Sequence, residues 1–382
     1  SVDGEPISSQ EFAELITKVR KACLDLQSEG LAHPTAFEIE TAAAFCYFYR
    51  RNCDFVVLET GLGGELDATN FIPHPLCSVL TSISMDHMAV LGNTLAEIAK
   101  AKAGIMKAGC PCVSAVQKPE AAAVIKKKAE LSGCRLYIAE PDRLADFSYD
   151  EKGSYFKVLS EQQLQNIFVN DKQGECPKPM PGHQKTDFET ELSGKTFYCA
   201  LAGEFQRQNI ACVLSVMKAL REKGIQITAE AVRAGLAKVQ LHGRFERIYE
   251  QPEFYIDGAH NEDAVAFLQN TIQNRFTNRY IVYIIGVLAD KDYEKALQPI
   301  LPYAAQIYTI TPPNDRALDG AVLAEWAGRC HQKVSFVPDI AHAVSLAAET
   351  AGAEGIVLAF GSFSFLKDIR QAVIEVYDRT DG

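Results

Sequence analysis

Residues 54–70 read DFVVLETGLGGELDATN, and this stretch decides the fold that we expect. The run from Asp54 to Glu59 is continuously apolar between two acids, as in a parallel strand that is buried on both faces. We therefore expect a buried strand at 54–59 whose carboxyl end borders a site. Glycine lets the turn that follows approach a ligand closely or adopt a positive φ. The turn lacks the GxGxxG spacing of dinucleotide-binding folds, and a tight turn capped by an Asp or Asn explains it equally well.

The segments on either side of this stretch alternate between helix and strand patterns. Apolar spacing predicts helices at 8–28 and 36–50. Beyond the glycine-rich turn, residues 77–84 and 111–116 have strand patterns, with a helix expected at 94–108 between them. Strands that alternate with helices predict an α/β fold with a parallel sheet.

The middle of the chain interrupts this alternation. Residues 141–197 are polar and rich in Gly, Pro and Gln, and we expect a small β or loop-rich excursion there. Helices are expected again at 204–221 and 228–237, and a fresh α/β series begins near residue 244. We expect its strands at 254–256, 280–286, 306–311, 334–337 and 356–360, and its helices at about 262–274, 292–300, 319–330, 339–351 and 364–377. This series predicts a second domain, with the boundary around 239–244.

The composition is that of an ordinary globular chain. Of 382 residues, 47% are hydrophobic and 23% are charged, which is enough for sizeable cores. No apolar run reaches the roughly 18–20 residues of a membrane-spanning helix, and the first residues do not form a signal peptide pattern. The net charge of −11 argues against a nucleic-acid surface, and eleven scattered cysteines without a CxxC pair indicate reduced thiols. We expect a cytoplasmic protein with neither nucleic acid nor membrane as a partner.

Two groups of polar residues in the first domain are candidates for chemistry. Asp86 and His87 follow the strand expected at 77–84, where an imidazole can bind a metal; a loop histidine bonded to backbone is the alternative. Lys100, Lys102 and Lys107 lie late in a helix, where the helix dipole favours cations. Lys102, flanked by small residues, has room to point into a site instead.

A third group opens the second domain. Arg244 lies at its start, and Asp257, His260 and Asn261 cluster at a strand-to-helix turn. Such a cluster can contact phosphate, base or metal, and a helix N-terminus favours anions. An ordinary N-cap turn is the alternative, in which Asn261 caps the helix and Gly258 permits the bend.

Seven segments stand out when the whole chain is taken together. They are ETGLGGELDATN (59–70), SISMDHMAVLGNTLAEIAKAKAGIMK (82–107), LAGEFQRQN (201–209), HGRFE (242–246), DGAHN (257–261), GVLADKDY (286–293) and GSF (361–363). In this order they resemble the folylpolyglutamate synthase and dihydrofolate synthase branch of the Mur ligase superfamily. The resemblance implies an α/β fold of two domains: a central P-loop-type, ATP-binding domain at 1–241 and a smaller Rossmann-like glutamate ligase domain at 242–382.

The resemblance also implies an activity. In this family ATP phosphorylates a carboxylate of the acceptor, the amine of L-glutamate attacks the acyl phosphate, and ADP and phosphate leave. A phosphate makes the carboxylate oxygen a good leaving group, and the transfer needs Mg²⁺ and nearby cations. The acceptor is dihydropteroate or a reduced folate, so the product is dihydrofolate, a folylpolyglutamate or both. The family precedent implies a monomer and two magnesium sites.

The site residues implied by the resemblance are spread over both domains. Glu59 and His87 match the Mg²⁺ ligands, and Lys102 matches a lysine whose carbamylation makes it an anionic ligand for a second Mg²⁺. Asn209 matches a residue near the nucleotide base, and Arg244 matches a linker arginine that reaches the ATP phosphates. Asp257 and His260 match contacts to the ribose and phosphate. Ser362 matches a residue bordering the glutamate pocket. We expect Lys102, Arg244 and His260 to act in catalysis.

One departure from the family pattern is large. These residues contain no GxxxxGK[ST] sequence, whereas the family's phosphate loop precedes the seven segments. The opening residues 3–7 resemble the family stretch that follows that loop. We therefore expect the chain to lack the P-loop strand and helix and to have little or no ligase activity alone. The alternatives are a non-catalytic or truncated Mur-ligase-like binding protein and a Mur-type ligase with another acceptor.

Overall fold

A computed structural model describes residues 1–85, 88–150, 152–160, 163 and 191–378. The chain divides into two units. The first comprises residues 1–143, 160–191 and 208–227, and the second comprises residues 144–159, 192–207 and 228–382. Both contain sheets and helices, so the α/β class expected from the sequence is confirmed.

The first unit is built on a parallel sheet of three strands in the order β1-β2-β3. The strands are β1 (Ser78–Leu80), β2 (Cys112–Ala115) and β3 (Leu136–Ala139). Helices α4 (Leu95–Lys102) and α5 (Pro119–Ser132) pack on the face that carries Leu80, through Ile98 and Ile125. The other face carries Val113, which contacts Ala211 of α8 (Phe205–Glu222). The sheet is therefore covered on both faces, as expected of a parallel sheet.

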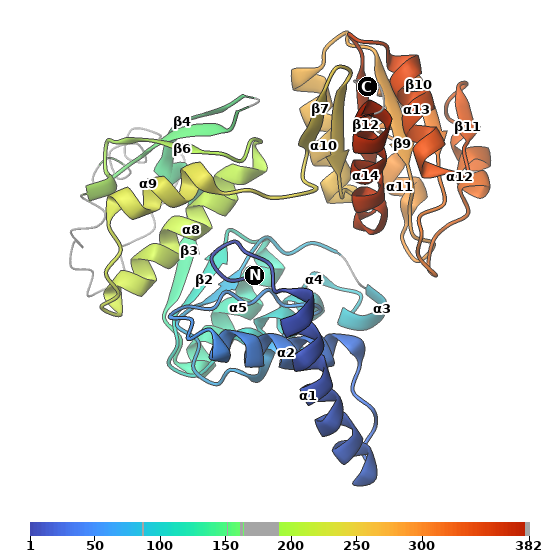
Figure 1. Cartoon of the computed structure of the whole chain (residues 1–382). Coiled ribbons are helices and arrows are strands. Elements are labelled where there is room, and N and C mark those ends of the chain that lie inside the picture. The colour runs from blue at the N-terminus through green and yellow to red at the C-terminus, as the bar shows by residue number, and fades with distance from the viewer. Residues whose placement is uncertain (86–87, 151, 161–162, 164–190, 379–382) are drawn as a thin grey trace. The chain divides into compact units, whose positions relative to one another are not determined.

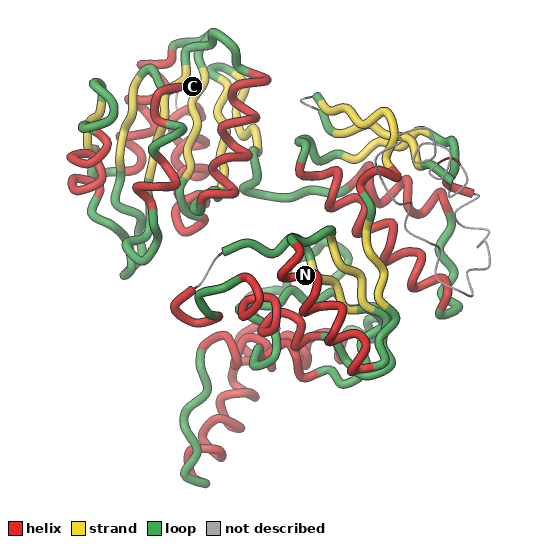
Figure 2. The backbone as a smooth tube through the Cα atoms, turned by 180° about the vertical axis from the view of Figure 1, so that it is seen from behind, coloured by secondary structure: helices red, strands yellow, loops and turns green. Residues whose placement is uncertain are grey.

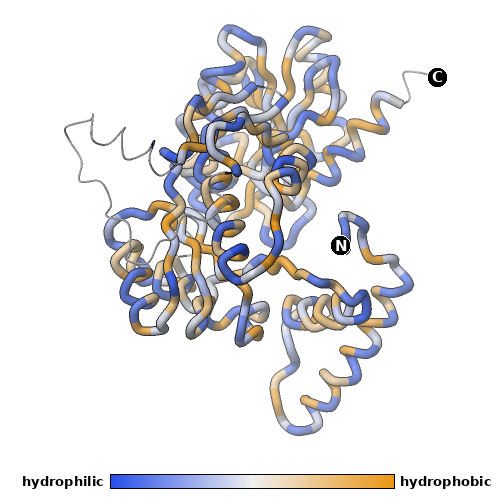
Figure 3. Tube along the Cα trace, turned by 90° about the vertical axis from the view of Figure 1, so that its left-hand side faces the viewer, coloured by the Kyte–Doolittle hydropathy of each residue, from blue (hydrophilic) through white to orange (hydrophobic). Residues whose placement is uncertain are grey.

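Two helices precede this sheet, with bounds close to those predicted. They are α1 (Ser9–Ser28) and α2 (Ala36–Arg50). Thr35 and Glu38 form a complete capping box at the start of α2. The seam between the helices is apolar and includes Leu15, Val19 and Tyr47. Figure 3 shows the matching alternation of hydrophobic and hydrophilic residues around the turns of these helices.

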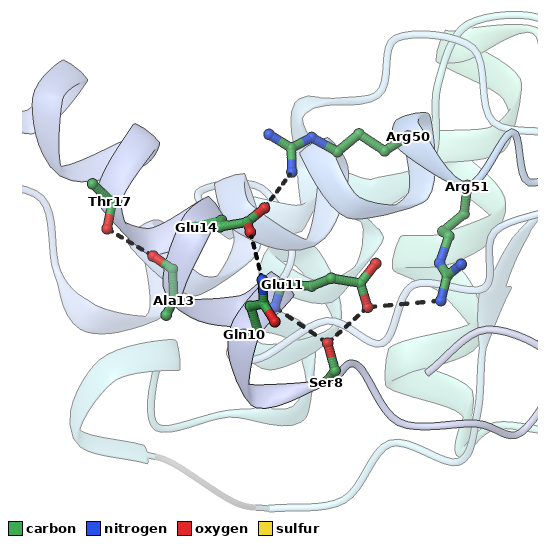
Figure 4. Close-up of polar contacts among 8 residues, drawn as sticks. All are labelled: Ser8, Gln10, Glu11, Ala13, Glu14, Thr17, Arg50 and Arg51. Atoms are coloured by element: carbon green, nitrogen blue, oxygen red, sulfur yellow. Dashed lines mark hydrogen bonds and ion pairs between the residues drawn. The ribbon is translucent and has the colours of Figure 1, made fainter.

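Polar contacts border that apolar seam (Figure 4). Glu14 lies 4.0 Å from Arg50, and Glu11 lies 3.8 Å from Arg51. Ser8 caps α1 by accepting a hydrogen bond from the Glu11 amide. Because exposed ion pairs contribute only about 0–1 kcal/mol, the apolar seam rather than these pairs holds the two helices together.

The prediction of a buried strand at 54–59 is wrong. The segment forms no strand, and the Phe55 and Val57 side chains are 56% and 96% exposed. Strand β1 pairs with β2 along one edge, and its other edge has no strand partner among the residues that the structure describes. The apolar pattern shows that the segment is suited to burial, but burial requires a neighbouring strand that the pattern cannot supply. The strand expected at 77–84 is also shorter, since β1 ends at Leu80.

The excursion expected at 141–197 is an antiparallel sheet in the part of it that the structure describes. Its strands are β4 (Leu144–Tyr149), β5 (Ser154–Val158) and β6 (Thr196–Cys199), in the order β4-β5-β6. Residues 164–190 lie outside the described part of the chain. Helix α9 (Ala229–Lys238) packs beside β6.

The second unit also contains a six-stranded sheet in the order β11-β10-β9-β12-β8-β7. The strands are β7 (Glu246–Glu250), β8 (Glu253–Asp257), β9 (Ile281–Ile285), β10 (Gln306–Thr309), β11 (Val334–Phe336) and β12 (Ile356–Phe360). All neighbours are parallel except β7 and β8, and β7 was not anticipated from the sequence. The five other strands lie close to their predicted positions.

Helices cover both faces of this sheet. They are α10 (Glu262–Arg275), α11 (Tyr293–Leu297), α12 (Gly320–Ala327), α13 (Ile340–Ala351) and α14 (Leu366–Asp378). Alternate residues of β9 separate the two cores, because Tyr283 packs with α10, α11 and α12 whereas Val282 packs with α13 and α14. Figure 1 shows α13 and α14 in front of the strands, and Figure 2 shows the sheet from behind.

This strand order determines which loops meet at the carboxyl edge of the sheet. Phe360, at the end of β12, is in register with Asp257, at the end of β8. The turn at 257–261 therefore lies beside the turn at 361–363. Crevices at the carboxyl ends of parallel strands are where such sheets bind ligands.

Two further observations concern expectations from composition. No helix in the described ranges is long and apolar enough to cross a membrane. The ten cysteines that fall within those ranges are free thiols.

Candidate functional site

A cavity of about 220 Å³ lies beside the carboxyl end of β1 in the first unit. Its lining combines a glycine-rich loop, side-chain hydroxyls and one ammonium group. The lining residues are Thr60, Gly61, Leu62, Gly63, Ser82, Ser84 and Lys102. Backbone N–H groups of a glycine-rich loop, hydroxyls and an ammonium group are the donors that cradle anionic ligands, so this lining suits a phosphate or a carboxylate.

Close backbone packing holds the glycine-rich loop against the end of α4. A Cβ added at Gly64 would lie 2.7 Å from the carbonyl oxygen of Lys102. A Cβ at Gly104 would lie 2.4 Å from the Cα of Glu65. The Glu65 amide donates to the Ala101 carbonyl at 3.1 Å. These glycines therefore permit two backbones to touch, and the contact places the loop beside Lys102.

Asp67 fixes the far end of the same loop. Its carboxylate accepts hydrogen bonds from the Leu62 amide at 2.8 Å and from the Thr69 amide and hydroxyl at 2.9 and 2.6 Å. Burial alone would raise the pKa of Asp67, but these hydrogen bonds outweigh it and lower the pKa below its ordinary value. The capped tight turn, offered above as the alternative explanation, is thus present at Asp67.

Gln117, which follows β2, was missed from the sequence. Its side-chain amide donates to the Thr81 carbonyl at 2.8 Å, and its side-chain oxygen accepts from the Ile83 amide at 2.9 Å. The two bonds bracket Ser82 and so shape one wall of the cavity. The available signal was a glutamine directly after a predicted strand. The neighbouring sequence does not indicate its hydrogen-bond partners, which lie more than thirty residues away.

The predicted metal ligands are only partly described. Lys102 is half-buried in the cavity wall, and Glu59 is exposed directly before Thr60 of that wall. His87 lies outside the described residues. Within the described ranges, no three His, Cys, Asp or Glu side chains are grouped to hold a metal ion.

Asn209 lies on α8 in the first unit and is exposed. Its neighbour Gln208 anchors that helix to the sheet by donating to the Ala139 carbonyl at 2.9 Å. Asn209 is not among the residues that line the cavity.

Asp257, a predicted site residue of the second unit, is buried, with 8% of its surface exposed. One carboxylate oxygen accepts from the Ala259 amide and the other from the Phe245 amide, both at 2.7 Å. Burial raises the pKa of Asp257 to about 6, and the two hydrogen bonds and the charge of Arg244 offset only part of that rise. Asp257 thus ties the start of β7 to the turn after β8.

His260 and Asn261 complete this turn. His260 Nδ1 lies 2.8 Å from the Gly258 carbonyl oxygen, which can only accept, so Nδ1 carries the hydrogen in this arrangement. Asn261 caps α10 by accepting from the Ala264 amide at 2.9 Å. The N-cap explanation therefore holds for Asn261, while His260 lies half-buried at the start of the helix.

The adjacent turn contributes Ser362 and Phe363. Ser362 is 5% exposed, and its hydroxyl accepts from the Ser364 amide at 3.2 Å. Phe363 lies beneath the guanidinium of Arg244, with 4.7 Å between Cζ and the ring centroid. Sequence reasoning noted the GSF segment but gave Phe363 no role.

Comparison with known proteins extends over nearly the whole chain. The profile of the Mur ligase glutamate ligase domain matches residues 243–363. A dihydrofolate synthase/folylpolyglutamate synthase of Bacillus subtilis is 35% identical over 374 residues, which cover 97% of this chain and 80% of that relative.

Solved structures give the same result for the fold. A folylpolyglutamate synthase of Mycobacterium tuberculosis complexed with ADP and AMPPCP matches with a TM-score of 0.79 at 26% identity, over 99% of this chain and 81% of that one. An FPGS–AMPPCP–folate complex matches with a TM-score of 0.73 at 27% identity, over 97% of this chain and 79% of that one. The two-domain α/β architecture expected from the sequence is confirmed by this likeness.

Proposed function

Because this chain belongs to the folylpolyglutamate and dihydrofolate synthase family of Mur ligases, we propose that it joins L-glutamate to a folate or to dihydropteroate at the expense of ATP. The observation that carries the proposal is the cavity of the first unit, where Lys102 and a glycine-rich loop line one space. Its donors suit the phosphate groups that an acyl-phosphate mechanism must hold. We further propose that residues 1–241 and 242–382 are the ATP-binding and glutamate ligase domains.

Lys102 is proposed as the central residue of the first unit. As an ammonium it neutralises phosphate charge, and as a carbamate it presents oxygen atoms to a cation. Mg²⁺ prefers oxygen ligands and keeps several waters, which fits the Glu59 carboxylate together with the hydroxyls of Ser82 and Ser84. Bound there with His87, Mg²⁺ would supply charge neutralisation for the transferring phosphoryl group.

The second unit is proposed to supply further nucleotide contacts. Arg244 is proposed to bind phosphate oxygens. His260 is proposed to contact phosphate near the N-terminus of α10, where the helix dipole favours negative charge. Each oxygen of the Asp257 carboxylate has a second lone pair beyond its backbone bond, which leaves it able to accept from a ribose hydroxyl. Asn209 is proposed to contact the base, and Ser362 to border the glutamate pocket.

The proposal includes expectations about the setting of the reaction. We propose a cytoplasmic monomer that takes ATP, L-glutamate and either dihydropteroate or a reduced folate. We also propose that these residues alone have little or no ligase activity over multiple turnovers, because they contain no GxxxxGK[ST] loop whose amides would cradle the β- and γ-phosphates.

The test is a single-turnover assay that can register slow chemistry. The chain, in excess over dihydropteroate or tetrahydrofolate, is incubated with Mg-ATP and L-glutamate, and the products are identified by mass. We expect ADP formation that requires both glutamate and a pterin, with one glutamyl residue added. Lys102→Ala should abolish the product, whereas Lys100→Ala, an exposed position on the same helix, should retain it.

Three outcomes would contradict the proposal. ADP release that does not depend on the pterin would contradict the proposed acceptor. Equal losses of product in the two lysine variants would contradict the proposed role of Lys102. Tight binding of ADP and folate without any glutamylated product would favour a non-catalytic binding protein.

A further inference from the structure

The second unit contains an aromatic contact that the proposed roles do not use. The Phe363 ring lies under the guanidinium of Arg244, with Cζ 4.7 Å from the ring centroid. The same ring meets the His260 imidazole edge-on, with 6.3 Å between centroids and 70° between planes. We propose that Phe363 is a positioning residue that holds the Arg244 side chain in the orientation needed to bind a nucleotide phosphate. The inference rests on the role given to Arg244 in the proposed function.

Two glycines form the notch that receives the Phe363 ring. A Cβ added at Gly258 would lie 2.2 Å from that ring, and a Cβ at Gly243 would lie 3.2 Å from it. These glycines come from different segments, the linker before β7 and the turn after β8. Ser362 fixes the backbone next to the ring by accepting from the Ser364 amide. The ring therefore occupies a site that any side chain at position 258 would fill.

The backbone on both sides of Arg244 is tied to the same turn. The Gly258 amide donates to the Gly243 carbonyl at 2.8 Å, and the Phe245 amide donates to the Asp257 carboxylate at 2.7 Å. Phe245 adopts a φ of +43° and stacks on Tyr255 at 4.8 Å between centroids. The main chain of Arg244 is thus anchored from before and behind, and its long side chain is the part that still needs a support.

An aromatic support suits a residue that must later bind an anion. A carboxylate partner would neutralise the guanidinium and occupy its N–H donors. A ring contacts the flat face of the guanidinium, and so it leaves the positive charge intact and the donors around the edge for phosphate. The carboxylate of Asp257 accepts backbone amides with both oxygens, which fits this division of roles.

Three variants distinguish the effect of the aromatic ring from the effect of side-chain size. Phe363→Leu removes the aromatic face, and Phe363→Tyr retains it. Phe363 is 44% exposed, and the control Phe336→Leu alters a ring that is 38% exposed on β11, the strand at the opposite edge of the sheet from β7. All three are made in the full chain, and thermal unfolding verifies that each is folded.

The first measurement needs no nucleotide. Trypsin cleaves after Arg244 only when that side chain leaves its support and enters the protease. A cation–π contact of about 0.5–1 kcal/mol corresponds to about a twofold to fivefold faster cleavage in Phe363→Leu. Phe363→Tyr and Phe336→Leu should be cleaved like the parent chain. Equal cleavage rates in all four proteins would overturn the contact.

The second measurement connects the contact to nucleotide binding. The dissociation constant of Mg-ADP is determined for the parent chain, for Phe363→Leu, for Arg244→Ala and for the double variant. Phe363→Leu should weaken binding by about twofold to fivefold, and this loss should disappear in the Arg244→Ala background. Phe363→Tyr should restore the parent affinity.

The outcomes distinguish the inference from the proposed function. An equal loss from Phe363→Leu with and without Arg244 would overturn the positioning role, because the ring would then act independently of the arginine. Parent affinity in Phe363→Leu would do the same. A parent chain that binds no ADP while trypsin cleavage still follows the expected order would instead overturn the nucleotide role of Arg244 and leave the contact standing.

Discussion

Gly64 determines how closely the glycine-rich loop can approach α4. A Cβ there would lie 2.7 Å from the Lys102 carbonyl oxygen and 2.9 Å from that of Ala101, and backbone atoms of a helix cannot rotate away. We expect Gly64→Ala to lower the free energy of unfolding by about 1–3 kcal/mol. Gly235→Ala is the matched control, because it lies within α9 with nothing within 4 Å of the added Cβ.

In that control alanine should raise the free energy of unfolding by about 0.5–1 kcal/mol, since glycine is the poorer helix former. Urea unfolding of both variants measures whether each substitution raises or lowers the free energy of unfolding. A Gly64→Ala chain as stable as the parent would show that the loop does not rest on the helix end.

Asp257 should leave a pH signature in the stability of the chain. Its pKa is raised from 3.8 to about 6 in the folded chain, so the folded state binds the proton more tightly than the unfolded state. The contribution of this proton to stability is present at low pH and is lost as the pH rises from about 4 to about 6, by at most about 3 kcal/mol. Asp257→Asn cannot titrate there, although it loses one of two acceptors.

The advantage of the parent chain over Asp257→Asn should therefore shrink between pH 4 and pH 6 and then level off. Urea unfolding of both proteins at half-unit pH intervals gives this difference directly. A difference that stays constant would mean that the carboxyl has the same pKa in the folded and the unfolded chain, and one that grows with pH would mean that folding lowers the pKa.

At the scale of elements, segment 54–59 is the feature that differs most from its sequence pattern. Phe55, Val56, Val57 and Leu58 are consecutive and exposed, and such a segment promotes association between chains. Val57→Lys should reduce light scattering and dye binding while changing the free energy of unfolding by no more than about 0.5 kcal/mol.

Leu66→Lys serves as the control, because Leu66 is equally exposed but lies outside that run. It should leave association nearly unchanged. A loss of more than about 2 kcal/mol in Val57→Lys would indicate a buried position and would restore the strand that the sequence pattern predicts.

The bounds of α1 and α2 were predicted closely because the signals that start and end a helix are local. The Thr35 and Glu38 capping box lies within four residues, and α2 begins and ends where the sequence pattern indicates. A strand depends on partners far along the chain, so β7, with its polar sequence ERIYE, was missed, and 54–59 was assigned to a sheet that it does not join.

The same difference between local and long-range signals explains which residues of the candidate site were predicted. Lys102 and Asp257 could be singled out from the sequence, because Lys102 lies late in a predicted helix between small residues and Asp257 directly follows a predicted strand. Gln117 and Phe363 were missed because their roles depend on contacts with residues 34 and more than 100 positions away, respectively. Such contacts exist only once the sheets are assembled.

At the scale of the whole molecule, the two units differ in how completely their sheets are enclosed. Every residue of β9 and β12 is buried, and β12 pairs with β9 on one side and β8 on the other. In the first unit β1 has three residues, of which the middle one is exposed, and it pairs on one side only among the described residues. Opening β1 therefore breaks fewer hydrogen bonds and exposes less apolar surface.

This contrast predicts the order of amide hydrogen exchange in the intact chain. The slowest amides should be those of β9 and β12, which open only when the six-stranded sheet unfolds, and the amides of β1 should exchange well before them. Mass spectrometry of peptic fragments after timed exchange gives both rates, and β10, with partners on both sides, provides the internal control. If β1 exchanged as slowly as β12, its second edge would have to be covered by another segment, and the exposed apolar run at 54–59 would be the first place to look for that segment's contacts.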